Sequence, residues 1–561
     1  MSTLLFEPIK EKINPASEIP LCLWTFLSSE NLLTPEILEK MVFINKTHQE
    51  NAELNDGLNS LIDHVFLPDI ATWLNQKHKT NHPFQFWAIL LKPWIGFVVN
   101  ASYYYFLLLE QYFKEYPEKV TVTLLELDSD WEFKDTDYFI RHGHLSTNFH
   151  QFLITEILRG SYSDKIKHEK VSPFSPPLVD VSNGFESIQD HRSRRCIKIP
   201  GMSTIAELLL SLLLTLKPAV DTPSHDPIFV SKDDQFSIPE TLRSTITECL
   251  KRSIPLSFTR YYEDYQKRAE KINYKKGKLR VFGAVSSTFE QMKFYLANAK
   301  AQGEILITTQ HGGNYGLHLS HWEPQLFEYR FHHFITWGWT SKPDQYANKI
   351  ALPSPYMKQF KNRHKFKNNT VIFIGTDINP LLYGFIPSFF EGKKCLEYRD
   401  DKLKFLNQLS QERLKTVAYR AYPNSRNRFS DNEYIRSNCP DLTLLEGDWT
   451  TLHKALFNSK LCVMDHLGTS LLICLSANVP FICFWRESFC DLNDEGRALI
   501  ETLKEDQLFF DDAKEAADFV NSLSNVESWW KSKQALRATL MNYYANNNDW
   551  FMPWLKKLLA I

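Results

Sequence analysis

Two runs of small and polar residues carry side chains that could do chemistry: DHLGTS at residues 465–470 and QHGGNYG at residues 310–316. In the first run, hydroxyls and free backbone N–H groups at the start of a helix suit a phosphate, because that end of a helix is positively polarised. In the second run, two glycines let a ligand approach the backbone. His311 is a general-base candidate near neutral pH. The two runs together indicate a site for a phosphate-bearing ligand.

Each run also has a plainer interpretation. Threonine and serine are common helix caps, so residues 468–470 alone are equally consistent with a helix start that binds nothing. The run also lacks the GxxxxGK pattern of a P-loop. A single histidine beside glycines is more often a buried, hydrogen-bonded residue than a base. The surrounding elements must therefore decide between the interpretations.

The segments around residues 465–470 predict an α/β unit. Apolar runs at residues 461–464 and 480–485 are typical of strands, and residues 469–477 between them predict a helix. Ligands bind such units at the carboxyl ends of parallel strands. Three further predicted strands end in polar residues: 371–374, 415–419 and 442–444. The residues expected to form one nucleotide- and phosphate-binding rim are Gly375, Thr376, Arg420, Glu446, Asp448, His466, Gly468, Thr469 and Ser470.

Within this rim, different residue types suit different parts of a nucleotide. Arg420 would pair with phosphate, since the fork of N–H donors on a guanidinium matches phosphate oxygens. Glu446 or Asp448 would hold the ribose hydroxyls. The alternative for Arg420 is an ordinary surface ion pair.

A second predicted α/β unit begins near residue 278 and carries the glycine-rich loop. Its predicted strands are residues 279–282, 304–309 and 331–337, and its predicted helix is residues 288–301. The loop residues expected to line a ligand site beside His311 are Gln310, Gly312, Gly313, Tyr315 and Gly316. The other histidines of this region lack the spacing of metal ligands, so we predict no metal.

Asp130 is a second candidate base, because it follows a predicted strand at residues 120–127. An aspartate that caps a turn is the alternative. The N-terminal part otherwise predicts helices, and the polar, proline-rich residues 161–200 predict a long loop. A proline-rich linker near residue 355 divides the chain. The predicted domains are residues 1–350 and 351–561, with a ligand cleft between them.

Composition restricts the class of protein. A net charge of −2 argues against a nucleic-acid binder. Nine scattered cysteines without a repeated CxxC pair argue against disulfides and favour a reducing compartment. The N-terminus lacks the apolar core of a secretory signal. Apolar stretches at residues 94–109 and 205–216 are shorter than a membrane span and predict buried helices. We therefore predict a cytoplasmic protein.

The C-terminal residues 550–559 combine aromatic and apolar side chains with two lysines. Such a segment could lie on an anionic membrane, which would make the protein peripheral at the inner membrane. We favour packing against the first domain, because large exposed apolar patches are uncommon on soluble monomers.

The ordered set of motifs resembles the transferases found in bacterial O-antigen and surface-polysaccharide gene clusters. These motifs are the QHGGxYG run, the aromatic residues 334–339, the RxYP run at 420–423, the DHxGT turn and the pair Trp529 and Trp530. The layout is similar to GT-B glycosyltransferases, in which two Rossmann-like domains face a cleft, with the acceptor domain first. Many such enzymes hold ribose with a glutamate after the phosphate turn. Residues 471–474 have none, so this contact would fall to Glu446 or Asp448.

The resemblance implies a glycosyltransferase of lipopolysaccharide or capsule biosynthesis that uses no metal and no separate cofactor. It would move a sugar from a nucleotide-sugar donor to a growing surface glycan or lipid-linked acceptor. His311, or alternatively Asp130, would deprotonate the acceptor hydroxyl. Two other hypotheses remain open: a nucleotide-sugar epimerase of the same architecture, and a non-catalytic glycan-assembly protein.

Overall fold

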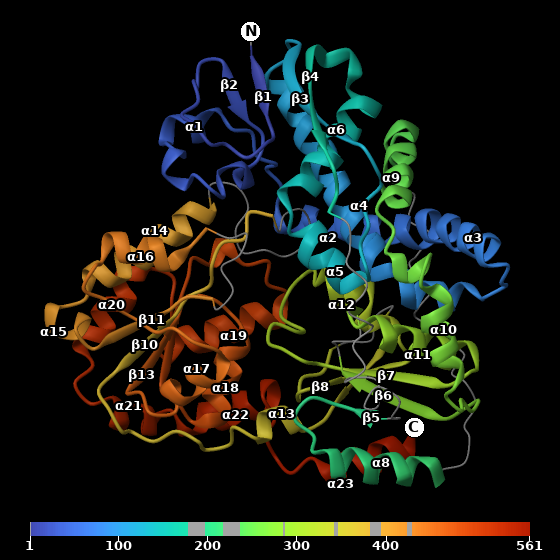
Figure 1. Cartoon of the computed structure of the whole chain (residues 1–561). Helices are drawn as coiled ribbons and strands as arrows, with labels where there is room; N and C mark the ends of the chain where they lie inside the picture. Colours follow the sequence, from blue (N-terminus) through green and yellow to red (C-terminus); the bar gives the residue numbers. More distant parts are fainter. Residues whose placement is uncertain are drawn as a thin grey trace.

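The computed structural model describes residues 2–177, 197–216, 236–283, 287–341, 346–381, 394–422 and 429–561. It is a mixed α/β fold with three parallel sheets and many helices (Figure 1). The predicted α/β class is therefore confirmed at this level.

The first sheet lies in the N-terminal part, where the sequence predicted mainly helices. Its strand order is β2 (Glu18–Pro20), β1 (Thr3–Leu5), β3 (Val120–Leu127) and β4 (Ile166–Phe174). Strand β3 has the predicted bounds. The loop predicted at residues 161–200 is wrong in part, because β4 pairs with β3 along its whole length. Strand β4 is mostly exposed and rich in charged residues, as sheet edges often are, so it shows no apolar pattern.

The N-terminal helices build one core around a single long helix. They are α2 (His48–Leu61), α3 (Leu67–His78), α4 (Phe84–Glu115), α5 (Thr136–Phe139) and α6 (Thr147–Ser161). Helix α1 (Pro35–Lys40) packs into a separate cluster with Ile378 and Tyr398. Helix α4 is long and apolar enough to cross a membrane, but 83% of its most apolar window is buried inside the protein. A helix that is apolar on all sides must be covered, and α4 is covered by protein. The buried helix predicted at residues 94–109 is confirmed.

The second sheet has five strands in chain order: β5 (Ile197–Lys198), β6 (Leu279–Gly283), β7 (Ile305–Thr309), β8 (His333–Thr336) and β9 (Asn348–Ala351). Helix α11 (Glu290–Ala301) joins one face of this sheet to the N-terminal core. Helices α8 (Thr204–Leu216) and α23 (Phe551–Ala560) cover the other face. The C-terminal segment thus packs onto residues 1–350, as the favoured interpretation predicted.

The remaining helices before the third sheet are α9 (Glu240–Arg252), α10 (Tyr262–Glu270), α12 (Trp322–Leu326) and α13 (Pro355–Lys358). Helix α9 packs against α4 and α6, and α10 packs against α11 (Figure 1). Helix α13 occupies the predicted linker and leads into the third sheet.

The third sheet positions residues 465–470, which we call the phosphate turn. Its order is β12 (Thr443–Leu444), β11 (Val417–Arg420), β10 (Val371–Ile374), β13 (Leu461–Met464), β14 (Phe481–Phe484) and β15 (Phe509–Phe510). Numbered within the unit this order is 3-2-1-4-5-6, which is the order of dinucleotide-binding folds. The order reverses between β10 and β13, where such folds bind their ligands.

Helices cover both faces of the third sheet, as parallel strands require. One face packs against α17 (Trp449–Leu456), α18 (Thr469–Ala477), α19 (Asp494–Glu505) and α22 (Gln534–Tyr544). The other packs against α14 (Lys394–Gln408), α16 (Asp431–Asn438), α20 (Ala513–Ser522) and α21 (Val526–Ser532). The second sheet runs in chain order without a reversal, so the prediction of two Rossmann-like domains is not confirmed.

Candidate functional site

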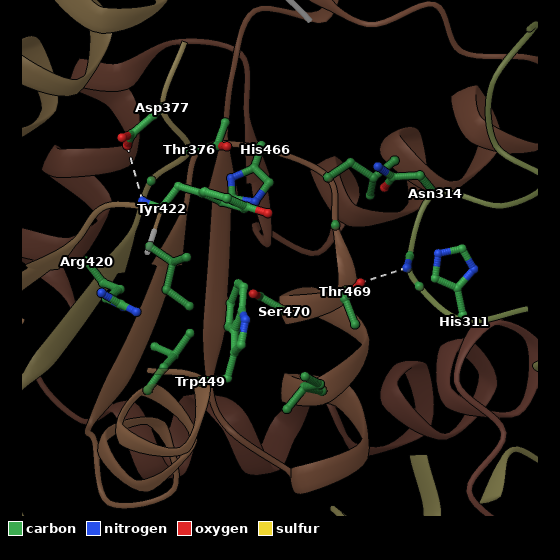
Figure 2. Close-up of a pocket in the computed structure, with 18 of the residues that line it drawn as sticks. His311, Asn314, Thr376, Asp377, Arg420, Tyr422, Trp449, His466, Thr469 and Ser470 are labelled. Atoms are coloured by element: carbon green, nitrogen blue, oxygen red, sulfur yellow. Dashed lines mark hydrogen bonds between the residues drawn. The ribbon is translucent and has the colours of Figure 1, made fainter. Parts of the chain in front are cut away.

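A cavity of about 730 Å³ lies at the carboxyl ends of β10, β11 and β13 and faces the glycine-rich loop (Figure 2). This places it at the strand-order reversal of the third sheet. The predicted residues that line it are His311, Gly312, Gly313, Tyr315, Gly375, Thr376, Arg420, His466, Gly468, Thr469 and Ser470. The structure therefore brings residues 310–316 and residues 465–470 together at one cavity.

The phosphate turn has the predicted geometry. Helix α18 begins at Thr469, and the residue before it is Gly468, which has no side chain to cap the first turn. The backbone N–H groups at this end, together with the hydroxyls of Thr469 and Ser470, lie at the cavity wall. An anion placed there would meet both hydrogen-bond donors and the positive end of the helix dipole.

The glycine-rich loop touches this turn directly. The N–H of Gly313 donates a hydrogen bond of 2.8 Å to the Thr469 hydroxyl oxygen (Figure 2). A Cβ atom on Gly313 would lie only 2.5 Å from the carbonyl carbon of Gly468. Glycine is thus required at residue 313 because the backbone of the phosphate turn occupies the space of a side chain.

His311 is held by a buried hydrogen-bond chain. Its Nδ1 lies 2.6 Å from the Tyr315 hydroxyl, which donates to the fully buried Glu328 at 2.6 Å. Because the tyrosine proton points to Glu328, Nδ1 of His311 must carry the proton that the phenol oxygen accepts. This tautomer leaves the lone pair of Nε2 available as a base.

Electrostatics keep this histidine neutral. The surrounding protein desolvates the imidazole and lowers the pKa of His311 to about 4. His311 lines the cavity, and 41% of its side chain stays exposed. Burial and the nearby Glu323 raise the pKa of Glu328 well above its usual range. The raised pKa favours the neutral form of this carboxyl, so Glu328 acts here through the hydrogen bond that it accepts from Tyr315.

Arg420 lines the cavity, but some of its N–H groups already donate hydrogen bonds within the protein. Its two terminal nitrogens donate to the carbonyl oxygens of Leu445, at 3.3 Å, and Gly447, at 2.6 Å. Its Nε has no hydrogen-bond partner among the described residues. Burial lowers the pKa of Arg420, although Asp377 and Asp448 oppose the shift. The arginine therefore shapes the loop before α17, and its Nε is itself buried.

The structure does not bring either predicted ribose ligand to the cavity. The Glu446 carboxylate is 74% exposed and lies 3.8 Å from Arg436. Asp448 caps α17 by accepting a hydrogen bond of 2.9 Å from the N–H of Thr451. A different carboxylate, Asp377, lies at the cavity wall and accepts from the N–H of Tyr422 at 3.2 Å.

Three other predicted residues have structural roles outside the cavity. Asp130 forms an exposed ion pair with Arg252 at 3.1 Å and does not line the cavity, which removes the geometric basis for a second base. Gln310 accepts hydrogen bonds from Trp339 Nε1, at 2.8 Å, and from the N–H of Trp337. Gly316 has a φ of +77° and packs against the Trp339 ring. These last two residues fix the shape of the loop.

Two aromatic side chains that the sequence did not assign to the ligand site stand at one side of the cavity. Tyr422 and Trp449 have ring centroids 6.0 Å apart and are 36% and 48% exposed (Figure 2). Large exposed rings next to apolar wall residues such as Leu452 and Ile473 suit a planar ring of a ligand. Pro423, which completes the predicted RxYP run, lies outside the described residues.

In the described ranges, no group of three or more histidine, cysteine, aspartate or glutamate side chains is placed to hold a metal ion. The start of α18 supplies hydrogen-bond donors at the cavity wall, and Arg420 supplies positive charge.

The sequence model described as LIC12162 family transferase matches residues 3–559. Among solved structures, a similar one is the crystal structure of accessory secretory protein 1,2 and 3 in Streptococcus pneumoniae. That match has a TM-score of 0.29 and 13% identity, and it covers 53% of this chain and 51% of that chain. The chain therefore spans about half the length of that structure. No curated protein matches the chain.

The contact between the two loops gives a direct test. We expect Gly313→Ala to lower the free energy of unfolding by about 1–3 kcal/mol, because the new methyl group overlaps the backbone of the phosphate turn. Gly312→Ala is the matched control, since its Cβ would lie 3.4 Å from the Thr469 hydroxyl oxygen, and we expect a change below about 0.5 kcal/mol. Urea unfolding measures both. Equal effects of the two substitutions would contradict the close contact.

Proposed function

We propose that this chain, which belongs to the LIC12162 family of transferases, is a glycosyltransferase that moves a sugar from a nucleotide-sugar donor to a bacterial surface glycan or lipid-linked acceptor. One observation carries the proposal. A single cavity is lined both by a helix start suited to phosphate and by a neutral histidine with a free lone pair. These two features come from different sheets and meet through Gly313 and Thr469.

The donor is proposed to lie on the third sheet. Its phosphates would accept hydrogen bonds from the start of α18 and would be attracted by the positive charge of Arg420, which lines the cavity. Its base would lie beside Tyr422 and Trp449, whose exposed rings offer stacking surfaces. Asp377 would hold the ribose hydroxyls in place of Glu446 and Asp448. The donor is a substrate, and the proposal includes no separate cofactor and no metal.

The acceptor is proposed to approach from the side of the glycine-rich loop. Nε2 of His311 would take the proton of the acceptor hydroxyl as its oxygen bonds to the anomeric carbon of the sugar. The bond from that carbon to the donor phosphate breaks at the same stage. The phosphate leaves with its negative charge, which the N–H groups of α18 and Arg420 stabilise. We place the reaction in the cytoplasm, where the donor would be supplied.

His466 would assist on the phosphate side. Its Nδ1 lies 2.8 Å from the buried carboxylate of Asp465, which orients the ring, and His466 lines the cavity. With Nδ1 donating to Asp465, the protonated ring would donate from Nε2 to a phosphate oxygen. The cavity therefore has one oriented histidine for each side of the proposed transfer.

Binding of the nucleotide can be tested with a panel of CMP, CDP, UDP, GDP and dTDP. We expect at least one nucleotide to raise the melting temperature of the protein, since a ligand of the folded state stabilises it. Trp449→Ala should weaken the binding of that nucleotide by about tenfold, because a stacking surface is lost. Phe366→Ala is the control, because Phe366 is also an exposed ring but does not line the cavity. If no nucleotide shifts the melting temperature, the proposal fails.

The role of His311 predicts a particular pH profile. A general base works only when unprotonated, and burial holds the pKa of His311 at about 4 instead of the ordinary 6.5. We therefore expect kcat/KM to rise with pH through about 4 and to be level at neutral pH. His311→Ala should remove transfer but leave nucleotide binding unchanged. An acid limb centred near 6.5 in the unaltered enzyme would argue against this base.

Product analysis separates the proposal from the two other hypotheses. Incubation with the donor alone should release no epimerised nucleotide sugar, whereas an epimerase needs no acceptor. In cells, His311→Ala and Arg420→Ala should each reduce surface glycan synthesis. Intact synthesis in both variants would favour a non-catalytic assembly role.

A further inference from the structure

Helix α8 exposes an apolar face that the sequence predicted to be buried. Its side chains Leu210 and Leu214 are buried against the second sheet. The opposite face carries five exposed apolar residues: Ile205, Leu208, Leu209, Leu212 and Leu216, between 44% and 78% exposed. The buried helix predicted at residues 205–216 is therefore wrong for half of its surface.

The five exposed residues form a continuous stripe and are not scattered. At 3.6 residues per turn they fall within an arc of about 100° around the helix axis. A wide apolar stripe on a helix is normally covered by protein or by lipid. Protein covers most of the apolar surface of helix α4, whereas the apolar stripe of α8 is exposed.

Helix α23 continues this surface. It contacts α8 and lies with it on the same face of the second sheet (Figure 1). Its buried side is formed by Trp554 and Leu558, while Met552 and Leu559 are 53% and 45% exposed. Helical geometry puts Lys556 on the same side as these two residues, and Lys556 and Lys557 are both exposed.

We propose that the outward faces of α8 and α23 bind the surface of an anionic lipid bilayer. We call this surface the apolar platform, defined by the five exposed residues of α8 with Met552, Leu559, Lys556 and Lys557 of α23. Apolar side chains flanked by lysines are typical of helices that lie in a membrane interface. The lysines would meet anionic headgroups while the apolar residues enter the acyl boundary.

Charge and length favour this occupant over others. The only carboxylate of the two helices, Glu207, is buried and accepts from the N–H of Ile199 at 3.3 Å, so the platform offers no partner for the lysines of a second copy. Helix α8 has 13 residues and is about 20 Å long, which is too short to span a bilayer core. It would therefore lie along the membrane surface.

The test uses the full chain and two kinds of vesicle: phosphatidylcholine alone, and an equal mixture of phosphatidylcholine and phosphatidylglycerol. We expect the protein to co-sediment with the mixed vesicles and to bind phosphatidylcholine alone more weakly. The double substitution Leu208→Glu, Leu212→Glu should weaken binding by about tenfold or more, because charge on the inserted face opposes burial. Phe366→Glu, an exposed apolar residue outside the platform, should bind as the unaltered protein does.

A second pair tests the same proposal without changing α8. Lys556→Gln, Lys557→Gln should reduce binding to the mixed vesicles by about tenfold, with an unchanged melting temperature. The proposal is overturned if the protein binds neither vesicle, or if both pairs of substitutions leave binding unchanged. It is also overturned if the protein sediments as a dimer that Leu208→Glu, Leu212→Glu converts to a monomer. Vesicle binding needs neither donor nor acceptor, so it is independent of the proposed transfer.

Discussion

The hydrogen bond between the Gly313 N–H and the Thr469 hydroxyl is the contact on which the candidate site depends. It closes the cavity because it joins a loop of the second sheet to the first turn of a helix on the third. The side chain of Asn493 strengthens the same junction by donating to the Gly316 carbonyl at 3.0 Å. The base and the phosphate turn therefore share one cavity wall, and their separation is set by backbone packing.

Buried charges hold the other side of the cavity. Lys402 is fully buried, donates to the Thr376 carbonyl at 2.6 Å, and pairs with Asp431 and, at 3.5 Å, with Asp465. Asp465 in turn orients His466. Buried ion pairs contribute little net stability, but removing one partner leaves an uncompensated charge. This network is therefore best understood as fixing the position of two cavity residues.

Local sequence patterns predicted the strands that surround the site but not which side chains face it. Continuous apolar runs ending in polar residues gave β10 and β13 their observed bounds, since such runs are typical of parallel strands covered on both faces. The sequence pattern does not predict the edge strand β4, because its charged residues leave no apolar run or alternation. Asp377 also follows β10, yet the sequence alone favours Glu446 and Asp448 as the residues that hold ribose. Strand position indicates the rim, whereas the direction of each side chain depends on loop geometry that has no sequence period.

Helices α4 and α8 show why the same apolar pattern can have two physical outcomes. Both are mainly apolar, so the sequence predicted burial for both. Helix α4 lies between other N-terminal helices and the second sheet, and 83% of its most apolar window is buried. Helix α8 lies in the outermost layer, where one face meets the sheet and the other has no protein layer beyond it among the described residues. An exposed face of this kind costs free energy in water, and the proposed contact with a membrane surface would offset that cost.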